Sequence, residues 1–218
     1  MDSSLTRPAT DGGPAAIAAP VFRPSVARAA AALAEIRNRI AAQHAAGSPG
    51  IQACGLAADM FDAAIVELWE AVVADLTAAD RAAVADRVAI VAHGGYGRRQ
   101  MAPGSDVDLM LLHDGSAVAT RAVAAAAKRL LQDLCDAGFT VGQSVRSLAE
   151  AVQLARADAT VLSSLLDSRP LAGPAGLVDA LALRVRRGIA RGRRRAAERL
   201  LAARGEEAER FGRSVALL

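Results

Sequence analysis

The sequence predicts an α+β fold with α/β-like character, in which a small mixed β-sheet is flanked by N-terminal and C-terminal helices. Two short apolar runs, residues 88–92 and 107–112, have the length of buried strands, whereas the apolar residues before and after them recur at helical spacing. Hydrophobic residues make up 53% of the 218-residue chain, so a buried core can form, and the abundant alanine favours helix.

The chain is expected to divide into four segments. Residues 1–22, rich in proline, glycine, alanine and serine, are expected to form a flexible tail. Residues 23–86 form an N-terminal helical segment, residues 87–173 a core that mixes strands and helices, and residues 174–218 a further helical segment. No internal repeat is evident in the sequence.

The N-terminal segment carries three helix patterns. Ser25 is a candidate cap of the first helix, which residues 47–50 (GSPG) should end. Thr77 and Asp80 predict the cap of a short third helix that ends near Asp86. The apolar stripes of the first and second helices are Val26, Ala29, Leu33, Ile36 and Ile40, and Phe61, Ile65, Leu68, Val72 and Leu76.

The core begins with a strand over residues 88–92 that enters a turn at Gly94 and Gly95. A polar connection over 96–105 leads to the second strand, and a third strand is expected over 139–145. The caps and stops expected for the later helices are Ser116 and Gly138, the capping box of Ser147 and Glu150, Asp158, and Gly173-Pro174.

The C-terminal segment predicts one or two long helices from about residue 176 and is very rich in arginine. Aromatic residues that could stack on bases are lacking there, so a solvated helix face, or a surface left bare by truncation, is favoured over nucleic-acid binding. Some of these arginines could instead reach a triphosphate. They are Arg184, Arg186, Arg187, Arg191, Arg193, Arg194, Arg195 and Arg199.

Composition excludes several classes of protein. The net charge of +3 is too small to indicate nucleic acid by itself, and the two cysteines, Cys54 and Cys135, lack a metal-ligand spacing or a disulfide framework. No apolar run reaches the length that crosses a bilayer, and the N-terminus lacks the pattern of a signal peptide. These features predict a cytoplasmic protein that binds neither membranes nor nucleic acid.

The strongest chemical signal is Asp106 and Asp108 at the start of the second strand. Side chains alternate along a strand, so both carboxylates should point to the same side. Adjacent carboxylates repel each other unless a cation lies between them, and Mg²⁺ prefers oxygen ligands that it shares with substrate phosphates. The pair therefore predicts a catalytic magnesium site.

The strand that ends at Gly94 and Gly95 supplies the complementary part. Glycines let the backbone approach a phosphate closely, and their N–H groups can bind it. Ser105 can add a hydroxyl donor, while Arg98 and Arg99 can neutralise polyphosphate charge. A glycine pair alone is usually only a turn, and Asp-x-Asp is more often solvated. Together, in this order, they favour in-line attack on an α-phosphate with pyrophosphate as the leaving group.

At these residues the chain resembles the polymerase-β-like nucleotidyltransferase superfamily, whose signature is a pair of small residues followed about ten residues later by Asp-x-Asp. It is more similar to the bacterial PII-protein uridylyltransferases. The stretches that carry this resemblance are GGYGRRQMAPGSDVDLMLL (94–112), VGQSVRSLAE (141–150), DATVLSSLLDSRPLAG (158–173) and ERFGRSVALL (209–218).

The resemblance implies a nucleotidyltransferase core over 87–173 that transfers UMP from UTP to a tyrosine of the PII nitrogen-signalling protein, with Mg²⁺ as cofactor. Asp106 and Asp108 match the metal-binding acids, and Gly94 and Gly95 the phosphate-loop glycines. Full-length relatives continue with an HD-type hydrolase domain and ACT domains, which nothing here resembles. We therefore expect a truncated amino-terminal part, with neither UMP removal nor glutamine sensing.

The chain also departs from the family pattern. Gln100 stands where relatives usually have Glu, and Cys135 where a Trp is common. Many superfamily members use a third carboxylate on a later strand, and the third strand here has none. Asp136 and Glu150 are the candidates, although a helix end and a capping box explain them equally well.

Other functions stay open at this point. The chain could be a related nucleotidyltransferase with another acceptor or nucleotide, such as a protein adenylyltransferase or a small-molecule enzyme, or a non-catalytic interaction module. His93 could touch nucleotide but is more typical of a hydrogen-bonded structural residue. Tyr96 could stack on the uracil or pack beneath the loop.

Overall fold

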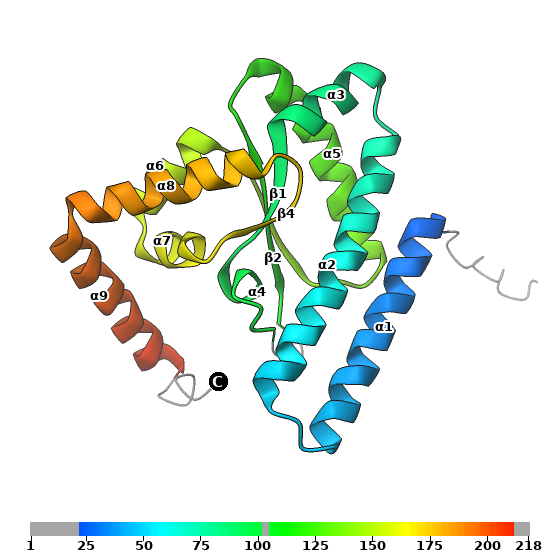
Figure 1. Cartoon of the computed structure of the whole chain (residues 1–218), viewed down its shortest axis with the longest axis horizontal. Coiled ribbons are helices and arrows are strands. Elements are labelled where there is room, and N and C mark those ends of the chain that lie inside the picture. The colour runs from blue at the N-terminus through cyan, green and yellow to red at the C-terminus, as the bar shows by residue number, and fades with distance from the viewer. Residues whose placement is uncertain (1–21, 102–104, 212–218) are drawn as a thin grey trace, which may run out of the picture.

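The computed structural model describes residues 22–101 and 105–211 and confirms the expected α+β fold (Figure 1). Helices precede, interrupt and follow a four-stranded sheet. The elements are α1 (Pro24–Ala45), α2 (Gly50–Ala74), α3 (Ala78–Arg87), β1 (Val88–Ala92), α4 (Gly94–Gly97), β2 (Val107–His113), α5 (Ala117–Asp136), β3 (Val141–Ser147), α6 (Leu148–Ala157), α7 (Ala159–Leu166), β4 (Arg169–Ala172), α8 (Ala175–Arg191) and α9 (Arg193–Phe211).

The sheet is mixed, with the strand order β3-β2-β1-β4. Strand β1 pairs antiparallel with both β2 and β4, and β2 pairs parallel with β3. The parallel pair is connected through α5, as a parallel connection requires a long crossover. This arrangement puts the last residues of β1 and the first residues of β2 at the same end of the sheet, because Ala92 pairs with Leu109.

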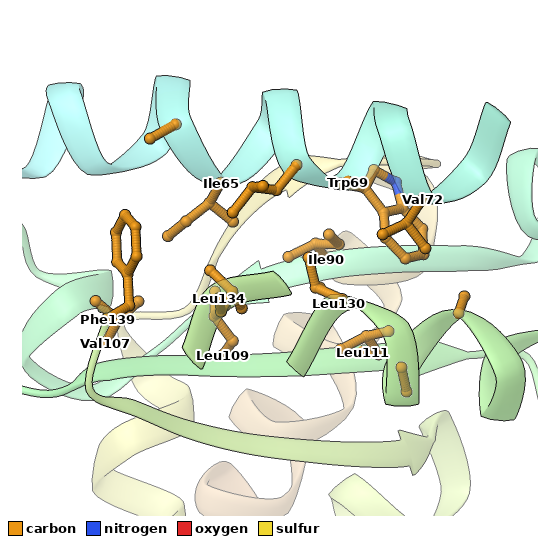
Figure 2. Packing of buried hydrophobic residues seen from close by; sticks show 14 of the residues in the cluster. Ile65, Trp69, Val72, Ile90, Val107, Leu109, Leu111, Leu130, Leu134 and Phe139 are labelled. Carbon is orange, nitrogen blue, oxygen red and sulfur yellow. The ribbon is translucent and has the colours of Figure 1, made fainter. Parts of the chain in front are cut away.

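Helices cover both faces of the sheet, which explains why β1 and β2 are nearly continuous apolar sequences. On one face, Ile90, Leu109 and Leu111 belong to a core formed with α1, α2, α3 and α5. On the other face, Val91 and Met110 pack with α6, α7 and α8. Figure 2 shows the first core, with side chains of α2 and α5 meeting those of the sheet. Trp69 of α2 is buried in this core, as expected.

Most of the expected helix ends are confirmed. The side chains of Thr77 and Ser116 cap α3 and α5, and Asp158 caps α7. The capping box of Ser147 and Glu150 opens α6 with both of its reciprocal hydrogen bonds. The remaining confirmed stops are the break between α1 and α2, Gly138 with a φ of 88° after α5, and Gly173-Pro174 between β4 and α8.

Two expectations need correction, and one strand was not predicted. Ser25 does not cap α1, because the helix begins at Pro24, and Ser25 is buried in its first turn. The third strand spans Val141–Ser147 rather than 139–145, since Phe139 is buried in the core before the strand begins. Strand β4 was not expected from the sequence. The predicted tail over 1–22 falls almost entirely outside the described residues.

No helix within residues 22–101 and 105–211 has the length and apolar character needed to cross a membrane.

Candidate active site

The glycine pair begins a single helical turn rather than an irregular loop. His93 follows β1 in extended conformation, and α4 then spans Gly94–Gly97. Gly94 adopts a φ of 59°, in the left-handed region where glycine is strongly favoured. The turn is closed by backbone hydrogen bonds from the N–H of Gly97 to His93 O (2.8 Å) and from the N–H of Gln100 to Gly95 O (2.9 Å).

The Asp108 carboxylate lies directly against this turn. A Cβ atom at Gly94 would lie 2.7 Å from Asp108 Oδ2, and one at Gly142 of β3 would lie 2.9 Å from Asp108 Oδ1. A hydrogen bond of 3.2 Å from the His93 N–H to Asp108 O also joins β2 to the residue before the turn. Side chains at either glycine position would therefore collide with the carboxylate.

Asp106 stands two residues before Asp108 and is exposed, whereas Asp108 is half-buried. Burial raises the pKa of Asp108, and the negative charge of Asp106 raises it further. His93 and Arg98 oppose this by favouring the charged form of Asp108. The charge of Asp106 therefore makes Asp108 costlier to ionise, which is the electrostatic condition that a bound cation relieves.

Arg98 and Ser105 lie in different surroundings. Arg98 is exposed at the end of α4, where its Nε donates to Gln100 Oε1 at 2.9 Å and its NH1 lies 3.8 Å from Asp167 Oδ2. Ser105 instead lines a cavity of about 260 Å³ between α1, α2 and the beginning of β2. Its expected role as a hydroxyl donor stays a prediction.

His93 and Ser164 add a polar contact behind the turn. His93 Nδ1 and Ser164 Oγ are 2.7 Å apart, and Ser164 Oγ would lie 3.3 Å from a Cβ at Gly94. Burial lowers the pKa of His93, although the charge of Asp108 opposes the change. The hydrogen-bonded interpretation of His93 therefore fits this contact. Sequence reasoning missed Ser164 as an individual residue, although it lies within the quoted stretch 158–173.

Tyr96 packs beneath the turn, which settles the alternative that the sequence left open. The ring is completely buried, and the hydroxyl donates to Asp62 Oδ1 of α2. Arg169 of β4 holds the same carboxylate with two hydrogen bonds of 2.6 and 2.9 Å. Sequence reasoning missed Asp62 and Arg169, and the only available signals were an acid beside an apolar stripe and the arginine of DSRPLAG.

The candidates for a third carboxylate both have local roles. Asp136 accepts a hydrogen bond of 2.7 Å from Gln132 at the end of α5. Glu150 is held in the capping box, where the N–H of Ser147 lowers its pKa. Beside Asp108, β3 offers Gly142. Within the described residues, no cluster of three His, Cys, Asp or Glu side chains could hold a metal ion.

Two carboxylates still fit a magnesium ion, because Mg²⁺ usually keeps several water ligands and takes one or two carboxylates together with substrate phosphates. The donors present, Asp106 and Asp108, are hard oxygen ligands of this kind, and the bulk of a side chain is missing beside Asp108 at both Gly94 and Gly142.

The arginine-rich C-terminal segment forms a separate feature. Arg184, Arg195 and Arg199 line a cavity of about 460 Å³ between α6, α7, α8 and α9. Its lining includes neither the acid pair nor the glycine turn.

Comparison with known protein families identifies the family to which this domain belongs. The family described as "Putative nucleotidyltransferase DUF294" matches residues 34–153, more than half of the chain and the part that contains the glycine turn and both acids. The chain belongs to the DUF294 nucleotidyltransferase family. It thus carries a nucleotidyltransferase domain, and the matched residues include both Gly94 and Asp108.

Individual relatives carry a more specific name. The chain is 47% identical over 89 residues to the bifunctional uridylyltransferase/uridylyl-removing enzyme of Pseudomonas entomophila, covering 41% of this chain and 10% of the relative. It is 46% identical over 87 residues to the enzyme of that name from Azotobacter vinelandii, covering 40% and 10%. The match to the Streptomyces coelicolor enzyme is 43% identical over 128 residues, or 57% and 15%. The matched segment is therefore a small fraction of each relative.

Proposed function

We propose that this chain transfers UMP from UTP to a tyrosine of the PII nitrogen-regulatory protein and releases pyrophosphate. The observation that carries the proposal is the contact between Asp108 and Gly94, which places the carboxylate pair beside the glycine turn. A nucleotide triphosphate placed there would meet backbone N–H groups and a metal-binding pair at once. The homology to uridylyltransferase/uridylyl-removing enzymes favours uridylyl transfer within the family.

In the proposed mechanism, the N–H groups at Gly94 and Gly95 bind the phosphates, and Arg98 contributes positive charge. Asp106 and Asp108 would hold Mg²⁺, which, when bound, neutralises charge on the triphosphate. The tyrosine oxygen forms a bond to the α-phosphorus while the bond to pyrophosphate breaks, and the phenolic proton passes to water. The protein contributes mainly by positioning and by charge.

The assignment of UTP as the nucleotide and the assignment of PII as the acceptor are supported by different observations. Uridylyl transfer is supported by the names of the relatives. The PII acceptor is supported by the resemblance of residues 141–150 and 158–173 to the PII-protein uridylyltransferases. Because the chain spans only 10 to 15% of these relatives, both assignments are proposals for this chain.

The test is incubation of the chain with each of the four labelled ribonucleoside triphosphates, Mg²⁺ and purified PII protein. Label from UTP on PII, absent with the Asp108→Asn variant, is the expected result. A PII variant whose acceptor tyrosine is replaced by phenylalanine should stay unlabelled. Label from another nucleotide, or only on another acceptor, would move the assignment to a different nucleotidyltransferase. No transfer from any nucleotide would favour a non-catalytic module.

A further inference from the structure

We infer that Arg169 and Asp62 are positioning residues that hold the glycine turn at its place beside the acid pair. This inference rests on the proposed function, because it concerns how the same site is assembled. It assigns a role to helix α2, which lies in the N-terminal segment and contributes none of the candidate site residues.

Arg169 lies beside the last residue of β1. In the β1–β4 pairing it lies opposite Ala92, the last residue of β1, so only His93 separates its partner from Gly94. A hydrogen bond of 3.4 Å from Arg169 NH2 to Tyr96 O reaches into the turn itself. The side chain therefore contacts the backbone of α4 from the neighbouring strand.

Asp62 completes the attachment from the opposite direction. Its two carboxylate oxygens accept the paired Arg169 hydrogen bonds, and Oδ1 also accepts from the Tyr96 hydroxyl. A planar guanidinium bound to both oxygens of a carboxylate fixes orientation as well as distance. One carboxylate on α2 thus ties β4 and α4 together, through residues that are 107 positions apart in the sequence.

The opposite charges of Asp62 and Arg169 compensate each other at a largely buried position. The Asp62 and Arg169 side chains are only 22% and 23% exposed, and Tyr96 is completely buried. The guanidinium carbon lies 5.1 Å from the centre of the Tyr96 ring, so the cation also interacts with the aromatic face. Burial and the Asp62 charge raise the pKa of Tyr96, which keeps its hydroxyl a neutral donor.

Loss of the Arg169 guanidinium would leave Asp62 as a partly buried charge with the Tyr96 hydroxyl as its remaining hydrogen-bond donor among the described residues. Without the Arg169 hydrogen bonds the turn would be held less firmly and could shift relative to Asp108, although the hydrogen bond from the His93 N–H to Asp108 O would remain. Because a displacement of about 1 Å in reacting groups can cost about 100-fold in rate, the effect should appear in the turnover number rather than in the fold.

The experiment measures kcat and KM for UTP in labelling of PII, together with the melting temperature, for the 218-residue chain and its variants. The test variants are Arg169→Met, which keeps length but removes charge, Arg169→Lys, and Tyr96→Phe. Arg28→Met is the matched control. Arg28 of α1 forms an exposed ion pair with Glu67, which lies on α2 as Asp62 does. Val72→Ala, which opens a cavity beneath α2, controls for loss of stability alone.

We expect Arg169→Met to lower kcat at least tenfold, with KM for UTP changed by less than about threefold. Arg169→Lys should recover part of the loss, and Tyr96→Phe should lower kcat less than Arg169→Met. Arg28→Met and Val72→Ala should keep kcat within about twofold of the unchanged chain, although Val72→Ala lowers the melting temperature.

An Arg169→Met variant with unchanged kcat would overturn the inference, and so would a loss of kcat in Val72→Ala equal to that in Arg169→Met at the same loss of stability. If Arg169→Met does not fold, an unchanged kcat in both Arg169→Lys and Tyr96→Phe overturns it instead. The proposed function fails separately, when the unchanged chain transfers no nucleotide.

Discussion

Asp108 Oδ2 lies 2.7 Å from the point that a Cβ atom would occupy at Gly94. This relationship joins the two halves of the sequence signature, because β1 and β2 are antiparallel neighbours and the turn after β1 meets the beginning of β2. It also explains why glycine stands at this position for two independent reasons, namely its φ of 59° and the space taken by the carboxylate.

Replacement of Gly94 by alanine should therefore disrupt both the turn and transfer. The left-handed conformation costs alanine about 1 kcal/mol, and the new methyl group would also displace Asp108. Gly95→Ala is the matched control for folding, since its Cβ would meet Gln100 O at an ordinary 3.6 Å. We expect a lower melting temperature and no measurable transfer for Gly94→Ala. A melting temperature equal to that of Gly95→Ala would contradict the steric argument.

Asp106→Asn and Asp108→Asn should each abolish transfer while leaving the fold intact. Neither substitution changes side-chain size, and removal of one charge relieves the repulsion that raises the pKa of Asp108. The melting temperature without metal should therefore be unchanged or slightly higher. Nucleotide incorporation into PII and thermal unfolding are the measurements, with Asp136→Asn at the end of α5 as the control that keeps transfer. Incorporation by either site variant at the unchanged rate would refute the assignment.

UTP with Mg²⁺ should stabilise the folded chain through ligand linkage. At a free ligand concentration about 100 times Kd, the free energy of unfolding rises by about 2.7 kcal/mol, or roughly 5–10 °C in melting temperature for a chain of this size. Excess chelator should remove most of the shift, and Asp108→Asn should show little of it. An equal shift with and without Mg²⁺ would speak against a metal held by the acid pair.

The strands and caps could be predicted because their signals are local. Strand β1 is apolar throughout, since helices cover both faces of the sheet, and the Thr77, Ser116 and Asp158 caps use neighbouring N–H groups. Strand β4 could not be predicted in this way. It is four residues long and contains Pro170, which is tolerated because β4 lies at the edge of the sheet.

The start of α1 was misjudged for a related reason. Ser25 looks like a cap, but Pro24 suits the first helical position, and Arg23 before it is fixed by Asp133, which lies 110 positions later in the sequence. The candidate site likewise combines contacts that the local sequence predicts with contacts that it does not. The approach of Asp108 to Gly94 follows from two consecutive strands, whereas the contact between Asp62 and Arg169 depends on packing that no local pattern encodes.

The capping box at α6 gives a prediction that depends on pH. The Ser147 N–H donates to Glu150 at 2.7 Å and lowers the pKa of this carboxyl below its ordinary 4.5. The unfolded chain lacks this bond, so the folded state binds the proton less readily. The resulting stabilisation is present above the unfolded pKa and is lost as the pH falls through the folded pKa.

Glu150→Gln should therefore lower the urea midpoint at about pH 7, and the difference from the unchanged chain should be smaller at about pH 3, because protonation of Glu150 removes its charge as the pH falls towards the folded pKa. Glu70→Gln is the matched control, since Glu70 is exposed on α2 outside any cap. Its effect at the two pH values measures the removal of a glutamate charge that lies outside a cap. A Glu150→Gln difference that is the same at both pH values, or larger in acid, would show that the charge on Glu150 does not stabilise the beginning of α6.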